Sequence, residues 1–423
     1  METAVIGAGY VGLVQAAGLA ALGHRVRLGE RSAERLTLLE SGKVPIYEPD
    51  LDRLVSDGVA SRLLTFHQAN TDATDSAQVV FIAVPTPSSD DGSADATIVE
   101  AVVAEIGPTL RAGALVVMKS TVPVGSARRF QDTLDAAGAT TTVLSNPEFL
   151  REGSAVADFF HPDRIVVGTR SQEAAEVMIE LYRGLDAPVV VTDPISSEMI
   201  KYGANAYLAA RITFANAMAN LCESVGADAR DVLLGMGYDR RIGFHFFNPG
   251  PGYGGSCFPK DTRALVAIAE DSGYDFSLLK GVIDVNNQQR LRIVDKARAA
   301  LGGTFDGVTI GLWGLAFKAG TDDIRESPAV DLANLLAAEG ASVRAYDPKV
   351  IAQIDSVERV PDALSAAKDA DLVLIATEWS EFRNVDLRAV RDAMRGRVII
   401  DARNMLDRKA VERLGMTYEG VGR

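Results

Sequence analysis

Cysteine and long apolar runs are scarce in this chain of 423 residues, and its positive charges are outnumbered by negative ones; each of these features excludes a class of protein. The two cysteines, Cys222 and Cys257, cannot build a disulfide framework, which fits a reducing compartment. A net charge of -14 repels phosphate backbones and argues against nucleic acid as a partner. No apolar run approaches the roughly 18 to 20 residues that cross a bilayer, and the N-terminus lacks a secretory pattern. We therefore expect a cytoplasmic protein with no membrane role and no metal site.

The order of apolar patterns predicts an α/β fold of two Rossmann-like parallel-sheet domains, joined by a long central helix and a helical middle domain. Short apolar runs alternate with helical patterns up to about residue 192 and again from Val308. Residues 195–225 contain no proline and one glycine, and their helical spacing predicts one helix of about 45 Å. The domain boundaries that we expect are 1–192, 193–300 and 301–423. The expected strands are 3–6, 25–29, 79–84, 115–119, 142–144, 165–167 and 189–191, then VTIGLWG, ASVRAYD, DLVLIAT and VIIDARN.

The stretch GAGYVG, residues 7 to 12, follows an expected strand and opens a helical stretch. In such a pattern the first glycine permits a tight turn, the second lets backbone approach a pyrophosphate, and the third lets helix pack on strand. Glu30 ends the second strand, where a carboxylate accepts hydrogen bonds from a ribose diol and repels a 2′-phosphate. The pattern predicts NAD over NADP, although Arg31 and Arg35 leave NADP open.

The second glycine-rich stretch is GYGGSCFPKD, residues 252 to 261, which surrounds Cys257. Lys260 favours the nucleophilic thiolate, whereas Asp261 opposes it unless that carboxylate is engaged elsewhere. The glycines allow close approach of a ligand. A reactive cysteine and a small buried turn residue are both open interpretations, whereas Cys222 lies in an apolar helical pattern and is expected in the core.

Two polar residues of the long helix, Lys201 and Asn205, are four apart and share a face. From the sequence alone, solvent exposure and a substrate contact explain these two polar residues equally well.

Eight motifs in chain order resemble the UDP-glucose/GDP-mannose dehydrogenase family, and they cover nearly the whole chain. They are GAGYVG, VPTP, KSTVPVG, SNPEFLREG, PDRIVVG, KYGANAYLA, NPGPGYGGSCFPKD and GLAFKAGTDDIRESP. The residues of PDRIVVG and NPGPGYGGSCFPKD are most similar to the UDP-glucose 6-dehydrogenase branch. The resemblance implies oxidation of a sugar C6 alcohol to a carboxylate with two NAD, through a thiohemiacetal and a thioester on a cysteine. GDP-mannose, UDP-galactose and UDP-N-acetylhexosamine are alternative substrates. A two-electron hydroxyacid dehydrogenase and a non-catalytic nucleotide-sugar sensor are alternative functions.

The resemblance also assigns roles to single residues. Cys257 matches the nucleophile, and Lys201 and Asn205 match residues that stabilise the oxyanion. Asp261 matches a residue that positions water or takes a proton, while Glu148 and Thr121 match residues of thioester hydrolysis, a solvent-exposed loop being the alternative for Glu148. The implied cofactor contacts are Gly7, Gly9, Tyr10, Val11, Gly12, Glu30, Arg35, Thr86, Ser120, Thr121, Glu152, Lys260 and Arg325. The implied substrate contacts are Phe149, Leu150, Arg151, Glu152, Lys201, Asn205, Arg241, Phe246, Phe247, Asn248, Pro249, Gly250, Gly254, Lys318 and Arg403.

Assembly and the C-terminal domain follow from the same resemblance. Arg241 matches an arginine donated across a subunit interface, so a homodimer or larger homo-oligomer with a dimerising central domain is expected. The C-terminal domain is expected to bind UDP and not a second NAD, because Asp347 ends a strand without a glycine fingerprint. For Arg325, a structural ion pair with Asp322 or Asp323 is the alternative to a cofactor contact. His245 and Phe244 depart from the family pattern.

Overall fold

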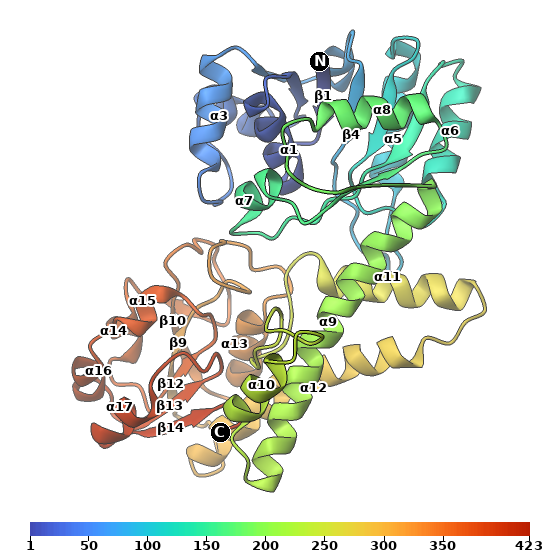
Figure 1. The fold of residues 1–423 in the computed structure, drawn as a ribbon. Coiled ribbons are helices and arrows are strands. Elements are labelled where there is room, and N and C mark those ends of the chain that lie inside the picture. Colours follow the sequence, from blue (N-terminus) through green and yellow to red (C-terminus); the bar gives the residue numbers. More distant parts are fainter. The chain divides into compact units, whose positions relative to one another are not determined.

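The computed structural model describes all 423 residues and divides into two compact units, each described by itself (Figure 1). Unit 1 contains Met1–Ala204 and Arg263–Tyr274, and unit 2 contains Asn205–Thr262 and Asp275–Arg423. Two helices, α9 (Pro194–Val225) and α11 (Phe258–Asp271), contribute residues to both units. No helix combines the length and the apolar character that crossing a membrane requires.

Unit 1 is built on an eight-stranded sheet of order β3-β2-β1-β4-β5-β6-β7-β8. All neighbours pair in parallel except β6 and β7, which are antiparallel. The strands are β1 (Glu2–Ile6), β2 (Arg25–Gly29), β3 (Leu64–His67), β4 (Val79–Ile82), β5 (Leu115–Met118), β6 (Thr142–Ser145), β7 (Ile165–Gly168) and β8 (Val189–Thr192). The helices are α1 (Tyr10–Ala21), α2 (Ala33–Glu40), α3 (Leu51–Ala60), α4 (Asn70–Thr74), α5 (Thr97–Ile106), the 3₁₀ turn η1 (Gly107–Thr109), α6 (Ser126–Ala136), α7 (Ala155–Phe160) and α8 (Gln172–Leu181).

Both faces of this sheet are buried, because side chains alternate between two apolar cores. In β1, Val5 joins the core that includes α1, α3 and α7, while Ala4 and Ile6 join the core that includes α5 and α6. The strand order reverses between β1 and β4, and ligands of such sheets bind beyond the carboxyl ends of the strands at that point. The GAGYVG loop follows β1 at this position.

Unit 2 carries a six-stranded parallel sheet of order β11-β10-β9-β12-β13-β14, drawn in orange and red in Figure 1. Its core combines strand residues such as Trp313 with residues of α9 and α12, and Cys222 belongs to this core as predicted. The strands are β9 (Thr309–Trp313), β10 (Ser342–Tyr346), β11 (Glu358–Arg359), β12 (Leu372–Ile375), β13 (Val398–Asp401) and β14 (Thr417–Gly420). The helices are α10 (Ala229–Gly237), α12 (Ser277–Ala300), α13 (Pro328–Ala338), α14 (Ala363–Ala367), α15 (Ser380–Arg383), α16 (Leu387–Ala393) and α17 (Arg408–Arg413).

The predicted fold class is confirmed, with local corrections. The long helix begins one residue earlier than expected, at Pro194, where a missing N–H costs nothing in the first turn. The predicted strand 79–84 ends at Ile82, ahead of Pro85, which cannot donate to a ladder. Strands β3, β11 and β14 were not predicted, because two to four residues between polar turns carry no clear alternation.

Candidate active site

The glycine loop after β1 has the geometry of a phosphate cradle. Gly7 has φ of 104°, and a Cβ there would lie 2.7 Å from the Ala83 carbonyl oxygen. A Cβ on Gly12 would collide with the Gly7 carbonyl, whereas one on Gly9 would meet no protein atom within 4 Å. Packing therefore explains the first and third glycines, and the open space at the second fits a dinucleotide pyrophosphate at the N-terminus of α1.

Glu30 lies at the end of β2, as predicted, and is fixed by its neighbours. Its carboxylate accepts from the Ser32 N–H at 2.8 Å and pairs with the Arg35 guanidinium at 3.4 Å. Arg35 also donates to the Ala8 carbonyl of the glycine loop, and Arg31 pairs with Glu105. Both arginines that left NADP open are thus held by acidic partners, which favours NAD.

A buried ion pair joins two of the predicted catalytic residues of unit 1. The Lys201 ammonium lies 2.7 Å from a Glu148 carboxylate oxygen, and their side chains are 4% and 7% exposed. The second Glu148 oxygen accepts from the Leu150 N–H at 2.7 Å. Burial alone would raise the pKa of Glu148, but the charge and hydrogen bond of Lys201 outweigh it and lower that pKa. The solvent-exposed alternatives for Lys201 and Glu148 are wrong.

The first half of α9 is tied to the carboxyl ends of the central strands, which fixes Lys201. Glu198 accepts from the N–H groups of Gly125 and Ala127, at 2.5 and 3.0 Å, and so caps α6. The Tyr202 hydroxyl donates to the Val122 carbonyl at 3.0 Å. These side chains flank Lys201 on the same helix and anchor it against the KSTVPVG loop, which carries Thr121.

Lys119 is a buried lysine that the sequence analysis missed. Its ammonium donates to Asn146 at 3.0 Å and to the Tyr182 hydroxyl at 3.4 Å, and the residue is 7% exposed. Burial lowers the pKa of Lys119 to about 7; the Glu148 charge opposes this fall, and the Lys201 charge adds to it. The only indication of this buried residue in the sequence is that a lysine directly follows an apolar strand.

This lysine predicts a pH-dependent stability. Between pH 7 and about 10.4 the unfolded chain holds the Lys119 proton and the folded chain does not, so stability rises with pH in that window. Lys119→Met should therefore raise the free energy of unfolding by up to about 4–5 kcal/mol at pH 6 and by about 2 kcal/mol at pH 9, which appears as a larger rise of the melting temperature at the lower pH. Lys43→Met, at an exposed lysine, is the matched control. Equal effects of Lys119→Met at both pH values would contradict the assignment.

In unit 2, the Asp261 carboxylate is engaged by Asn205 and Lys260. Asn205 donates its amide to one Asp261 oxygen at 2.6 Å, and the Lys260 ammonium lies 2.5 Å from the other. Asn205 and Asp261 are 6% and 1% exposed, so the exposed alternative for Asn205 is wrong. Cys257 is half-buried one residue before α11, with Sγ 3.6 Å from the Ser256 hydroxyl.

The glycines before Cys257 are required by the protein itself. A Cβ on Gly252 would lie 2.7 Å from Asn286 Oδ1, and one on Gly255 would lie 2.8 Å from the Phe317 ring. Gly254 packs against the Glu326 carbonyl. The space that we expected for a ligand at these three positions is therefore filled by protein neighbours, while the role of Gly254 in substrate binding stays a prediction.

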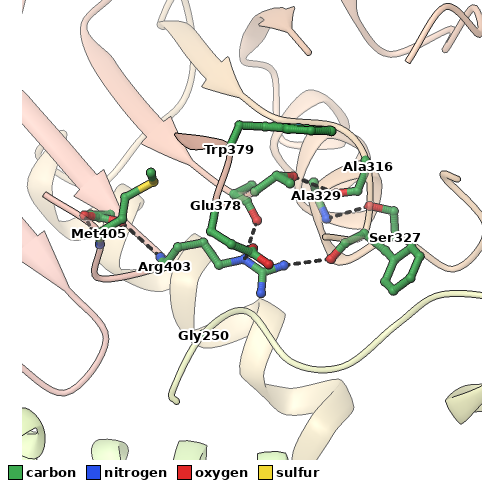
Figure 2. A network of polar contacts seen from close by, with 12 residues as sticks. Gly250, Ala316, Ser327, Ala329, Glu378, Trp379, Arg403 and Met405 are labelled. Atoms are coloured by element: carbon green, nitrogen blue, oxygen red, sulfur yellow. Dashed lines mark hydrogen bonds and ion pairs between the residues drawn. The ribbon is translucent and has the colours of Figure 1, made fainter. Parts of the chain in front are cut away.

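Arg403 links the carboxyl ends of three strands of unit 2. It follows β13, donates through Nε to the Ala376 carbonyl and through Nη2 to the Phe317 carbonyl, both at 2.8 Å, and pairs with Glu378 at 3.0 Å (Figure 2). Lys318 follows on the same loop as Phe317, with its ammonium 5.8 Å from that ring. Two cations thus lie around the β9–β12 switch point, where an anionic ligand is expected.

Asp347 directly follows β10 and is fully engaged by the protein. Its carboxylate accepts from the N–H groups of Leu315, Ala316, Lys349 and Val350, and from the Trp379 indole. The residue is 3% exposed, so the carboxylate organises this loop cluster and has no capacity left for a ribose diol. The expectation that the C-terminal domain binds no second NAD stays a prediction.

The loop of residues 243–250 is held against α9 by Arg211, a second residue that the sequence analysis missed. Arg211 donates to the carbonyls of His245 and Gly243 at 3.0 and 3.2 Å and lies over the Phe247 ring. Phe246 adopts φ of 57°, a strained value that is common at binding sites. His245 and Phe244 are exposed, which leaves their departure from the family pattern without a structural explanation.

The remaining predicted residues are placed as follows. Arg325 pairs with Asp323 at 2.5 Å, as in its alternative interpretation, and Arg241 pairs with Asp239 at 2.6 Å. Arg151 pairs with Asp158, and the Ser120 hydroxyl donates to the Val84 carbonyl. Thr86 and Gly250 are buried, Tyr10, Val11, Thr121, Glu152 and Pro249 are half-buried, and Asn248 is exposed.

Three domain models of one family match the chain in order. They are the NAD binding domain, the central domain and the UDP binding domain of the UDP-glucose/GDP-mannose dehydrogenase family, at residues 1–186, 195–288 and 311–408. The chain belongs to this family. Membership in the UDP-glucose/GDP-mannose dehydrogenase family confirms the predicted NAD cofactor and the predicted oxidoreductase class.

Relatives in the family match over their full length. A UDP-glucose 6-dehydrogenase of Rhizobium meliloti is 44% identical, and the match covers 100% of this chain and 100% of that protein. A UDP-glucose 6-dehydrogenase of Pseudomonas aeruginosa is 43% identical, and the match covers 100% of this chain and 98% of that protein. A UDP-glucose dehydrogenase structure from Pyrobaculum islandicum has a TM-score of 0.91 at 38% identity, covering 99% of this chain and 97% of that one. A UDP-D-ManNAc dehydrogenase structure from Pyrococcus horikoshii has a TM-score of 0.90 at 27% identity, covering 100% and 99%.

Proposed function

We propose that this protein is an NAD-dependent UDP-glucose 6-dehydrogenase that oxidises UDP-glucose to UDP-glucuronate. The full-length relatives of that name support the sugar. The observation that carries the four-electron chemistry is Cys257, half-buried, with the neighbouring Asp261 carboxylate engaged by Asn205 and Lys260. A two-electron alcohol dehydrogenase needs no such thiol.

The proposed chemistry has two oxidations separated by addition to Cys257. Bound NAD supplies the hydride acceptor for each oxidation. After the C6 alcohol becomes an aldehyde, the Cys257 thiolate bonds to the aldehyde carbon, and the carbonyl oxygen takes a proton to give a thiohemiacetal. Oxidation of this adduct leaves a thioester, and water then attacks its carbonyl carbon, breaks the C–S bond and releases the carboxylate and the thiol.

Charge development at the carbonyl oxygen assigns roles to the buried polar residues. Lys201 contributes a positive charge and Asn205 an amide donor to the oxyanion of each tetrahedral species. Glu148, ionised beside Lys201, is the proposed base for the water that hydrolyses the thioester, with Thr121 as a hydrogen-bonding partner of that water. Asp261 holds Asn205 in position and supports proton removal from the alcohol.

The sugar is tested by turnover of the purified protein with UDP-glucose beside GDP-mannose, UDP-galactose and UDP-N-acetylmannosamine. We expect UDP-glucose to give the highest kcat/KM and UDP-glucuronate as the product in mass spectrometry. A higher kcat/KM with any of the other sugars would correct the substrate and keep the mechanism. The UDP-D-ManNAc dehydrogenase among the structural relatives is the reason for including the acetylated sugar.

The choice of coenzyme is expected to depend on Glu30. Glu30→Ser removes a carboxylate acceptor for the ribose diol, worth about 1.5–3 kcal/mol, and should raise KM for NAD by about 10- to 100-fold. The same change removes the acidic partner of Arg35, so activity with NADP should rise relative to NAD. Glu34→Ser, at an exposed position of α2, is the control. An unchanged ratio of the two coenzymes would contradict the assignment.

A homodimer or larger assembly is part of the proposal. The second half of α9 exposes Tyr207, Phe214, Leu221 and Val225 by 64%, 50%, 54% and 69%, and the first three are spaced by seven residues. Arg241, in the loop that follows α10, is exposed and matches the arginine that relatives donate across an interface.

Leu221→Arg should shift sedimentation from dimer toward monomer, while Leu364→Arg, at another exposed leucine, should not. Identical sedimentation of both variants would contradict a dimer contact through Tyr207, Phe214 and Leu221.

Within this proposal, residues 1–192 bind NAD, residues 193–300 carry the cysteine loop and the dimer contacts, and residues 301–423 bind the UDP moiety through Lys318 and Arg403. A cytoplasmic location fits the free thiols Cys222 and Cys257 and the NAD and nucleotide-sugar substrates.

A further inference from the structure

The segment of residues 250–253, which leads into the Cys257 loop, is buried without belonging to a helix or a strand. Residues 250–255 are all buried. The backbone N–H and C=O groups of such a segment need partners, because an unpaired buried peptide group is costly. At both ends of the segment these partners are side chains, and they come from α9 and α12 of the same unit.

Three amide side chains serve the first and last residues of the segment. Asn286 of α12 pairs with Tyr253 in both directions: its Oδ1 accepts from the N–H at 2.8 Å, and its Nδ2 donates to the carbonyl at 3.2 Å. Gln289, one turn further along α12, donates to the Gly250 carbonyl at 3.0 Å. Asn216 of α9 accepts from the Gly250 N–H at 2.7 Å.

These amides occupy positions where a helix would ordinarily bury apolar side chains. Asn216, Asn286 and Gln289 are 0%, 2% and 1% exposed. Gln289 is oriented by Asn220, which donates to its oxygen at 2.9 Å. Nδ2 of Asn216 has no hydrogen-bond partner, so its bond to the Gly250 N–H is the only one that compensates for burying that amide.

The fit between α12 and the segment leaves no spare room. Gly252 has φ of 100°, and a Cβ there would lie 2.7 Å from Asn286 Oδ1. Arg290, next to Gln289, also donates to the Tyr253 carbonyl at 3.0 Å. The segment is therefore fixed in the way that a strand is fixed by its neighbour, except that side chains replace the neighbouring backbone.

We propose that Asn286 and Gln289 are positioning residues of Cys257, which hold the backbone of residues 250–253 so that the thiolate meets the C6 carbon. The inference rests on the proposed nucleophilic role of Cys257. A displacement of about 1 Å at a reacting atom costs on the order of 10²-fold in rate, so a loss of these bonds should appear in kcat. Neither residue belongs to the motifs from which the catalytic residues were assigned.

The test compares two adjacent glutamines of α12. Gln289→Met removes the bond to Gly250, whereas Gln288→Met changes an exposed side chain on the same turn. In Gln289→Met we expect at least about tenfold faster amide exchange in the peptide of residues 248–257, and kcat about 10- to 100-fold lower, with KM for UDP-glucose changed by a smaller factor than kcat. Gln288→Met should match the wild type in all three measurements.

Gln289→Glu provides a second variant in case the methionine variant fails to fold. A buried carboxylate next to the Gly250 carbonyl has a raised pKa, and only its protonated form can donate to that carbonyl. The kcat of Gln289→Glu relative to wild type should therefore rise as pH falls, a rescue that a purely structural role does not produce.

Unchanged exchange in residues 248–257, or faster exchange with an unchanged kcat, would overturn the positioning role while leaving the proposed function intact. If Cys257→Ser turned over UDP-glucose as fast as the wild type, both the proposed function and the positioning role would be overturned.

Discussion

Cys257→Ser should lower the turnover of UDP-glucose to the acid by at least about 10³-fold, the largest effect of any single substitution considered. A serine hydroxyl is much less acidic than a thiol and stays protonated at neutral pH. It is therefore a poor nucleophile, and the aldehyde is not captured for the second oxidation. The measurement is NADH formation under saturating UDP-glucose and NAD, with the product analysed by mass spectrometry.

The matched control is Cys222→Ser. Cys222 is 3% exposed in the core of unit 2, so its replacement should reduce stability slightly and leave the activity of the folded protein unchanged. Full activity of Cys257→Ser, or equal losses in both variants, would contradict the assignment of the nucleophile.

The buried pair of Lys201 and Glu148 should yield the second-largest effects, and these separate catalysis from stability. Lys201→Met removes the positive charge that we propose stabilises the oxyanion, so kcat should fall by about 10²- to 10³-fold. It also leaves Glu148 as an unpaired buried charge, which costs about 3–5 kcal/mol of stability. Glu148→Gln keeps the shape of the side chain, loses the proposed base, and should lower kcat by about 10²- to 10³-fold.

The double variant, Lys201→Met with Glu148→Gln, distinguishes the two roles. Removing both charges together eliminates the unpaired carboxylate, so the melting temperature should recover most of the loss seen in Lys201→Met. Activity should stay as low as in the worse single variant. If activity recovers along with stability, the pair is a structural ion pair and nothing more.

The pH dependence of this pair has a defined sign. The folded-state pKa of Glu148 is lowered, so its contribution to stability is complete above the unfolded value of about 4.3 and is lost as pH falls through the folded pKa. In Lys201→Met the burial of Glu148 raises its pKa instead, so the stability deficit of this variant relative to the wild type should shrink as pH falls from about 7 toward 4.

Residues whose roles are local to the chain could be predicted from the sequence. The GAGYVG turn needs glycine at Gly7 because of its positive φ and at Gly12 because of its contact with Gly7, both local to one βα unit, and Glu30 follows from the length of the next strand. The long helix follows from spacing alone. The Cys257 loop was singled out because a cysteine among glycines is followed by a lysine and an aspartate, and its nucleophilic role stays a prediction.

Residues whose roles depend on distant partners could not be predicted. In the sequence, Lys119 is an ordinary residue at the end of a strand, and only the fold shows that it contacts Asn146 and Tyr182. Arg211 and Gln289 are ordinary helical residues until loops more than thirty positions away accept their hydrogen bonds. The glycines before Cys257 were interpreted as room for a ligand, because the sequence does not reveal that Asn286 and Phe317 occupy that room.

The most direct test of the account is the number of NADH molecules formed per UDP-glucose consumed by the purified wild-type protein. Oxidation of an alcohol to an acid through a thioester on Cys257 predicts a ratio of two, with UDP-glucuronate as the product and no free aldehyde. A ratio of one, with a released aldehyde, would contradict the four-electron mechanism and remove the reason for a nucleophilic cysteine.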